Sequence, residues 1–266
     1  MLAAGGRHCS VDVNLALPFR GTAAVIERKR PEDEMMHFFD YMSNMDVIAL
    51  GFFLIMIGVY TLVTDHSALR ARSISAAIDR QRENWMQEAR RREFRMLDSS
   101  ILGVLVSGVS IFASTNIFVI GGLIAGLAYN EELSAAFSSV PFAAPISPGR
   151  WSIKLTLLLG IFVYAFFKFA WAIRLANYCA ISVGAMCDPA DAGTDIALAR
   201  AKAASRLAAL CGHHFNRGLR ANFFGLAVLG WFFSPTLFMA GTLFVVLILL
   251  RREFFSGALA AVKDTP

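Results

Sequence analysis

The sequence predicts an all-α integral membrane protein with four transmembrane helices and two cytoplasmic amphipathic helices. The chain of 266 residues is 56% hydrophobic, contains 23 Phe and has a mean hydropathy of +0.55, which is too apolar for an ordinary soluble domain. Several apolar stretches are long enough to cross a hydrocarbon core of about 30 Å at about 1.5 Å per residue. Basic residues cluster where these stretches end, as the positive-inside rule expects.

Charge and cysteine content limit the kinds of binding partner that the sequence predicts. The formal charge is +5 and the pI is near 9.2, but basic residues at span ends indicate membrane topology rather than nucleic-acid binding. We therefore expect the lipid bilayer as a partner, with a further copy of the chain or another membrane protein, and no nucleic acid. The cysteines lack CxxC or zinc-ligand spacing and are interpreted as reduced structural thiols: Cys9, Cys179, Cys187 and Cys211.

The chain divides into a flexible N-terminal tail, a membrane domain and a short C-terminal tail. Residues 1–45 carry a charged run and no cleavable signal pattern, so we expect little fixed structure there. The membrane domain is predicted over 46–259 and the C-terminal tail over 260–266. Its spans are expected at about 47–64, 99–129, 152–184 and 221–250. Pro235 is expected to kink the fourth span.

Counting basic residues predicts the sidedness. The loops at 65–98 and 185–220 contain eight and five basic residues, so both are placed in the cytoplasm. Four spans then put both termini on the opposite side. The prediction is a multi-pass protein of the bacterial inner membrane with two periplasmic termini.

The cytoplasmic loops are predicted to form the two amphipathic helices. In residues 67–97, apolar positions recur at helical spacing, namely Ile74, Ile78, Trp85, Ala89 and Met96. The second helix follows breakers at 188–193 and a cap at Thr194. Its shared face consists of Ile196, Ala199, Ala203, Leu207, Leu210 and His214.

The second span carries small residues on one helical face. They are spaced three, four or seven apart, and are Gly103, Ser107, Ser110, Ser114, Gly121 and Ala125. Small side chains let helices approach closely in lipid, so this stripe is interpreted as a helix-packing surface. The alternative is a polar path through the membrane, in which the serines join Asn116 and Lys168.

Polar residues near the cytoplasmic ends of the spans form a second candidate site. The expected cluster comprises Asp65, His66, Arg174, Asn177, His214, Asn216 and Arg220, together with His213 and Arg217. Asp65 is predicted to pair with Arg174 or Arg220, because an unpaired charge at the membrane edge is costly. Asp65, His66, Cys211 and His214 offer atoms suited to a metal. However, His213 and His214 point about 100° apart on a helix, and HExxH, P-loop and GxSxG motifs are missing. No cofactor or metal is expected.

Several phrases of the sequence together resemble one known family. They are DHS at 65–67, WM at 85–86, IFASTNIFVIGGL at 111–123, KFAWAIRLANYC at 168–179, HFNRGLRANFFGLAVLGWF at 214–232 and RREFFSGAL at 251–259. The chain resembles the domain-of-unknown-function family five hundred and ninety-nine, multi-span membrane proteins of bacteria and land plants. The resemblance covers about 46–259 and implies a membrane fold, with no activity or catalytic residue to carry over.

Three functional hypotheses follow. The leading one is a non-enzymatic inner-membrane scaffold or accessory subunit of a membrane complex, oligomeric and built on a compact four-helix bundle. The second is a small transporter or channel with a polar path along the second and third spans. The third is a membrane metalloenzyme that uses the cytoplasmic-edge His/Asp cluster.

Overall fold

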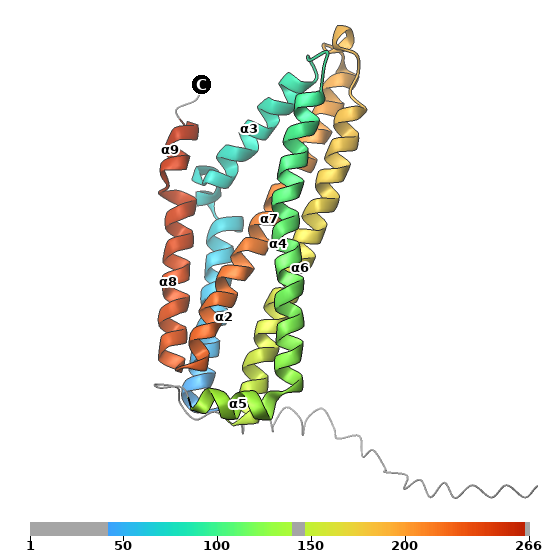
Figure 1. Cartoon of the computed structure of the whole chain (residues 1–266). Coiled ribbons are helices and arrows are strands. Elements are labelled where there is room, and N and C mark those ends of the chain that lie inside the picture. Colours follow the sequence, from blue (N-terminus) through green and yellow to red (C-terminus); the bar gives the residue numbers. More distant parts are fainter. Residues whose placement is uncertain (1–41, 140–146, 264–266) are drawn as a thin grey trace, which may run out of the picture. The chain divides into compact units, whose positions relative to one another are not determined.

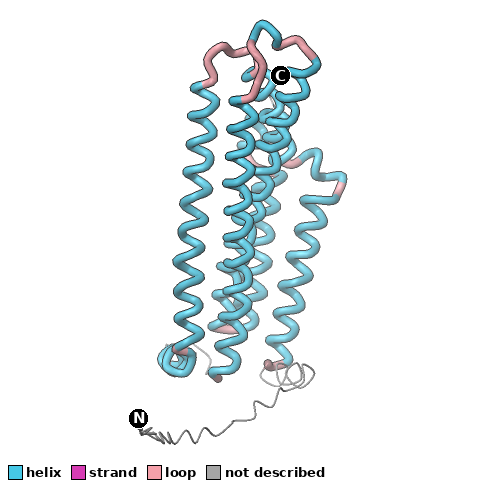
Figure 2. The backbone as a smooth tube through the Cα atoms, turned by 90° about the vertical axis from the view of Figure 1, so that its right-hand side faces the viewer, coloured by secondary structure: helices cyan, strands magenta, loops and turns pink. Residues whose placement is uncertain are grey.

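The computed structural model describes residues 42–139 and 147–263, and every regular element in these ranges is a helix (Figure 1 and Figure 2). The long helices are α2 (Asn44–Thr61), α4 (Met96–Ala128), α6 (Pro148–Gly184), α7 (Asp195–Leu229) and α8 (Pro235–Phe254). The shorter ones are α3 (Ile74–Ala89), α5 (Asn130–Ser138) and α9 (Gly257–Lys263). A π-helical turn, Leu62–His66, and 3-10 turns at Ala68–Arg72, Pro189–Asp191 and Gly230–Phe232 connect them. The predicted N-terminal tail lies almost wholly outside the described residues.

Three helical segments have the length and apolar composition needed to cross a membrane: Asn44–His66, Met96–Ala128 and Pro148–Gly184. They coincide with the first three predicted spans. Local sequence signals fix where they begin. Ser43 and Asp46 form a reciprocal capping box at α2, and Pro148 occupies the first turn of α6, where its missing N–H is not needed.

The packing of α6 against α4 and α7 forms the centre of the described bundle. The helices α4 and α6 are antiparallel: Phe112 stacks on Phe169 with ring centroids 5.7 Å apart, and Gly126 faces Leu155. Both pairs give one register, which places Ser107 level with Arg174. Gly218 of α7 also lies against the Phe169 ring, at 2.6 Å from the position a Cβ would take. Large rings of α6 therefore fit over small residues of α7.

The small-residue stripe of α4 does not pack within this chain. Its members are exposed, except for Ser110, which is half-buried. The buried face of α4 consists instead of Asp98, Leu102, Val109, Ala113, Asn116, Leu123 and Gly126. Larger side chains fill the space between α4 and α6, so the stripe turns outward and its role in contacts between chains stays a prediction.

The fourth span is not the single kinked helix predicted over 221–250. Helix α7 ends at Leu229, the chain turns through Gly230–Phe232, and α8 begins at Pro235, with Ser234 as its N-cap (Figure 1). Proline fits the first helical position because its missing N–H is not needed there, so it starts a new helix. Gly230 lies close to the backbone of α8 at this reversal. A Cβ added to Gly230 would lie only 3.2 Å from the Leu237 carbonyl oxygen, so the absence of a side chain permits the close approach.

The reversal makes α8 run alongside α2 in the same direction. At the start of both helices, Trp231 Nε1 donates to Asp46 Oδ1 at 2.7 Å. At the other end, Glu253 lies beside Arg220 and accepts from the Ser75 backbone N–H at 3.4 Å. The start of α2 and the end of α8 thus lie at opposite ends of the bundle. The single fourth helix on which the prediction of two termini on one side depended is therefore replaced by a hairpin, and α2, α4, α6, α7 and α8 form the described bundle in place of a four-helix bundle.

The two expected amphipathic helices differ in extent and face. The first is shorter than 67–97: α3 ends at Ala89, and Met96 starts α4 with 83% of its surface exposed. Its buried residues are Ala77, Met86 and Ala89. In α7, Ile196 and Leu210 are exposed at 63% and 46%. The buried residues before Gly212 are Ala197, Ala201, Ala204, Ser205, Ala208 and Cys211. Small residues therefore face α6 and α3 in the first half of α7, and their size permits close contact between the helices.

Candidate functional site

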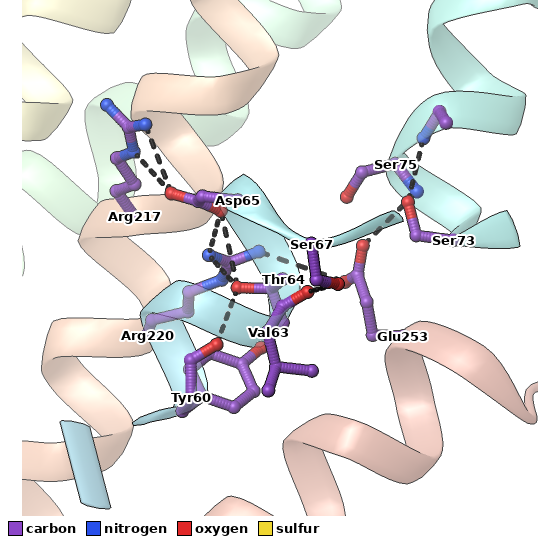
Figure 3. A network of polar contacts seen from close by, with 11 residues as sticks. Tyr60, Val63, Thr64, Asp65, Ser67, Ser73, Ser75, Arg217, Arg220 and Glu253 are labelled. Carbon is purple, nitrogen blue, oxygen red and sulfur yellow. Dashed lines mark hydrogen bonds and ion pairs between the residues drawn. The ribbon is translucent and has the colours of Figure 1, made fainter. Parts of the chain in front are cut away.

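Asp65 lies at the centre of a polar network where α2 ends. The π-helical turn Leu62–His66 carries it, and such turns occur often at functional sites. Asp65 Oδ1 accepts from Arg220 Nη1 at 2.9 Å, and Oδ2 accepts from Arg217 Nη2 at 3.1 Å (Figure 3). Thr64 Oγ1 accepts from Arg220 at 3.2 Å and donates to the Tyr60 carbonyl at 3.0 Å. One carboxylate therefore holds two arginines that lie one turn apart on α7.

The network continues from Arg220 to α8 and α3. The Arg220 guanidinium lies over the Tyr60 ring, 5.2 Å from its centroid, and 4.0 Å from the Glu253 carboxylate. The side chains of Arg220, Asp65 and Glu253 are only 13%, 16% and 7% exposed. Since Glu253 also accepts from the Ser75 N–H (Figure 3), the network joins α2, α7, α8 and α3 at one level.

This arrangement favours a structural role over a catalytic one. A guanidinium stays protonated in proteins and cannot serve as a general acid or base. Two guanidiniums engage both oxygens of Asp65. A buried pair of this kind is strongly destabilised when one partner is removed, because the other charge is left desolvated.

The structure brings together part of the predicted cluster. Asp65 and Arg220 pair as predicted, whereas Arg174 is exposed and donates from Nε to the Tyr178 hydroxyl at 2.8 Å. His66 and Asn177 are exposed, and Asn216 is half-buried. His214 is half-buried, with its ring 6.4 Å from that of Trp171. The cluster is therefore narrower than expected.

Sequence reasoning missed Glu253 altogether, and it included Arg217 in the cluster without pairing it with Asp65. Glu253 is the single acidic residue near the end of an apolar helix. A carboxylate in that position needs a cationic partner, and this signal could have identified it.

A second ionic contact ties α3 to α7. Asp79 accepts from Arg82 Nη1 at 2.8 Å and lies 2.9 Å from His213 Nε2. Burial alone would raise the pKa of Asp79, but the hydrogen bond and charge of His213, then those of Arg82, outweigh it and lower the pKa. The Arg82 guanidinium packs directly on Gly212, where a Cβ would clash. The contact therefore combines charge with close backbone approach.

The far end of α3 is held by a buried carboxylate. Asp98 is fully buried and accepts from Trp85 Nε1 at 2.7 Å and from Arg92 Nη1 at 2.5 Å. Arg95 and Arg200 donate to carbonyls at the end of α6, those of Met186 and Ala185. These bonds satisfy acceptors that a helix end leaves free.

Another polar junction lies where α2 and α8 begin. Lys154 of α6 is 6% exposed, and its Nζ donates to the Trp231 carbonyl at 2.7 Å. The Trp231 indole donates to Asp46. Contacts from α6 and from α2 therefore hold the turn between α7 and α8 in place.

The two pathway candidates lie apart from these networks. Asn116 is fully buried, and its Nδ2 donates to the Phe112 carbonyl at 2.7 Å. In the described part of the chain its Oδ1 has no hydrogen-bond partner. Lys168 is half-buried, with Nζ 5.0 Å from the centre of the Tyr164 ring. Within residues 42–139 and 147–263, no three His, Cys, Asp or Glu side chains are grouped so that they could hold a metal ion.

Fold and site together define a class: a helical protein with three segments able to cross a membrane and ion-pair networks between its helices. Residues 48–258 match the family described as "Protein of unknown function, DUF599". The match covers most of the chain, which therefore belongs to the DUF599 family. Among curated proteins and among solved structures, nothing matches the chain.

Proposed function

We propose that this protein is a non-enzymatic, oligomeric membrane scaffold or accessory subunit that carries a rigid helical stalk into the cytoplasm. The observation behind it is helix length. The helices α4, α6 and α7 have 33, 37 and 35 residues. At about 1.5 Å per residue each reaches about 50 Å or more, against a hydrocarbon core of about 30 Å. About 20 Å of the α4–α6–α7 packing thus extends past the membrane.

The side on which this stalk lies follows from charge. The loops at 65–98 and 185–220 hold eight and five basic residues. Reversal of α8 adds Arg251 and Arg252 to the same end of the bundle. Arg150 stays at the opposite end, near the start of α6. The positive-inside rule then puts the α3 end in the cytoplasm of a bacterial inner membrane. In this orientation α2, α4 and α6 cross the bilayer, and the hairpin of α7 and α8 crosses it twice more.

The ion-pair networks suit a scaffold. Asp65, Arg220 and Glu253 join three membrane helices to the start of α3, and Asp79 with His213 fixes α3 on α7. A stalk held in this way keeps a fixed orientation relative to the membrane.

Purification in mild detergent tests the proposal. The mass of the complex and its protein content would be measured on one sample, against a chain mass of 29.1 kDa. The proposal expects a multiple of that mass or a partner in fixed ratio. A homogeneous monomer without a partner would rule it out.

Transport is the second candidate, and the buried Asn116 favours it. An amide oxygen without a partner inside a membrane helix is expensive, and Asn116 Oδ1 has none among the described residues. A solute or ion could use it as a ligand. Reconstituted vesicles should then show flux that Asn116→Leu abolishes, whereas flux unchanged by this substitution excludes Asn116 as a ligand on the path.

A further inference from the structure

The outer face of α4 carries no charged residue along its whole length, and large apolar side chains form a ridge on it. Val104, Ile111 and Phe118, spaced seven residues apart, form its ridge and are 71%, 64% and 80% exposed. Toward the start of the helix the same side exposes Met96 and Leu97, at 83% and 61%. In a membrane protein most of such a surface would contact lipid tails.

Lipid cannot cover all of it. In the α4–α6 register set by Phe112 with Phe169 and Gly126 with Leu155, Ser107 is level with the exposed Arg174. The segment from 108 to 128 already spans about 30 Å at 1.5 Å per residue. Residues 96–107 therefore continue for about 18 Å above the hydrocarbon core. Without a protein partner, Met96, Leu97 and Val104 would contact water.

The chemistry of this face identifies the partner. The only ionisable residue of α4 is Asp98, and it is fully buried in contacts with Trp85 and Arg92. Other helices expose charges at the same height, among them Arg174 and Arg200. Two copies in one membrane have the same orientation, so residues near a two-fold axis meet their own counterparts. A charged residue there would meet a like charge, and the outer face of α4 has none.

We propose that the outer face of α4 is a parallel self-association interface, in which a second copy of this chain covers Met96, Leu97 and Val104. A second copy presents the same uncharged face at the same membrane depth. Exposed small residues beside the ridge, such as Gly103 and Ser107, let the two helices approach closely. The inference rests on the proposed membrane orientation and identifies one partner of the scaffold.

Disulfide cross-linking in native membranes tests the interface by position. Val104→Cys is compared with Ile181→Cys, because Ile181 is also an exposed apolar residue, at 69%, and lies at a similar height on α6. The unmodified chain gives the background from its own four cysteines. With a mild oxidant, Val104→Cys should give several times more covalent dimer than either comparison. Dimer formation by Val104→Cys no greater than by Ile181→Cys overturns the interface.

A second pair of variants separates this interface from the scaffold proposal. Val104→Arg should convert the detergent-purified oligomer into a smaller species, and Ile181→Arg should leave its mass unchanged. If the unmodified chain is oligomeric and Val104→Arg keeps its mass, the α4 interface is wrong while the scaffold proposal stands. If the unmodified chain is a lone monomer, both fail.

Discussion

At the scale of single residues, Asp65 couples the end of α2 to α7 through Arg217 and Arg220. Asp65→Asn leaves Arg220 with reduced charge compensation in a site where its side chain is 13% exposed. Breaking such a pair costs about 3 kcal/mol, or a fall of roughly 6–12 °C in the unfolding temperature of a chain this size. Arg220→Gln should have a similar effect, and the double variant should lose little more. Thermal unfolding in detergent measures all three.

Arg174→Gln is the matched control for this cycle. The sequence favoured Arg174 and Arg220 equally as partners of Asp65, but Arg174 bonds to Tyr178 instead. The stability lost in Arg174→Gln should therefore add fully to the stability lost in Asp65→Asn. Additive losses for Asp65→Asn with Arg220→Gln would contradict the observed pairing.

At the scale of helices, the contact of α6 with α7 depends on small residues. A Cβ at Gly218 would lie 2.6 Å from the Phe169 ring, which is fully buried. Gly218→Ala should therefore destabilise the protein by about 1–3 kcal/mol through overpacking. Gly58→Ala, on a helix face with nothing within 4 Å, should be neutral or slightly stabilising. Equal unfolding temperatures for the two variants would contradict this packing.

Sequence patterns predicted the positions of the helices better than they predicted which helix faces are buried. Length and apolar composition were sufficient for the three segments able to cross a membrane. Pro235 indicated a break, but a kink and a reversal share that signal, and the contacts of Trp231 with Asp46 and Lys154 decide between them. On α4 the small stripe looked like the packing face. The buried face is instead the one that carries Leu102, Val109 and Leu123, because these larger side chains fill the space against α6.

At the scale of the whole molecule, the candidate site could be predicted only in part. Asp65 and Arg220 were identified because charges at a membrane edge need partners. Glu253 joins them only once α8 has turned back alongside α2. Its place in the site therefore depends on a reversal that helical periodicity does not encode.

In the proposed orientation, α7 and α8 form a hairpin in the membrane, and the stalk lies on the same side as the end of α8. Labelling with a membrane-impermeant thiol reagent tests it, in vesicles of both orientations and against the background of the unmodified chain. Three exposed positions are used: Asn177→Cys on the stalk, Ala258→Cys after α8 and Ser139→Cys after α5. We expect Asn177→Cys and Ala258→Cys to be labelled from the cytoplasmic side and Ser139→Cys from the other. Labelling of Ala258→Cys from the same side of the membrane as Ser139→Cys would contradict this arrangement.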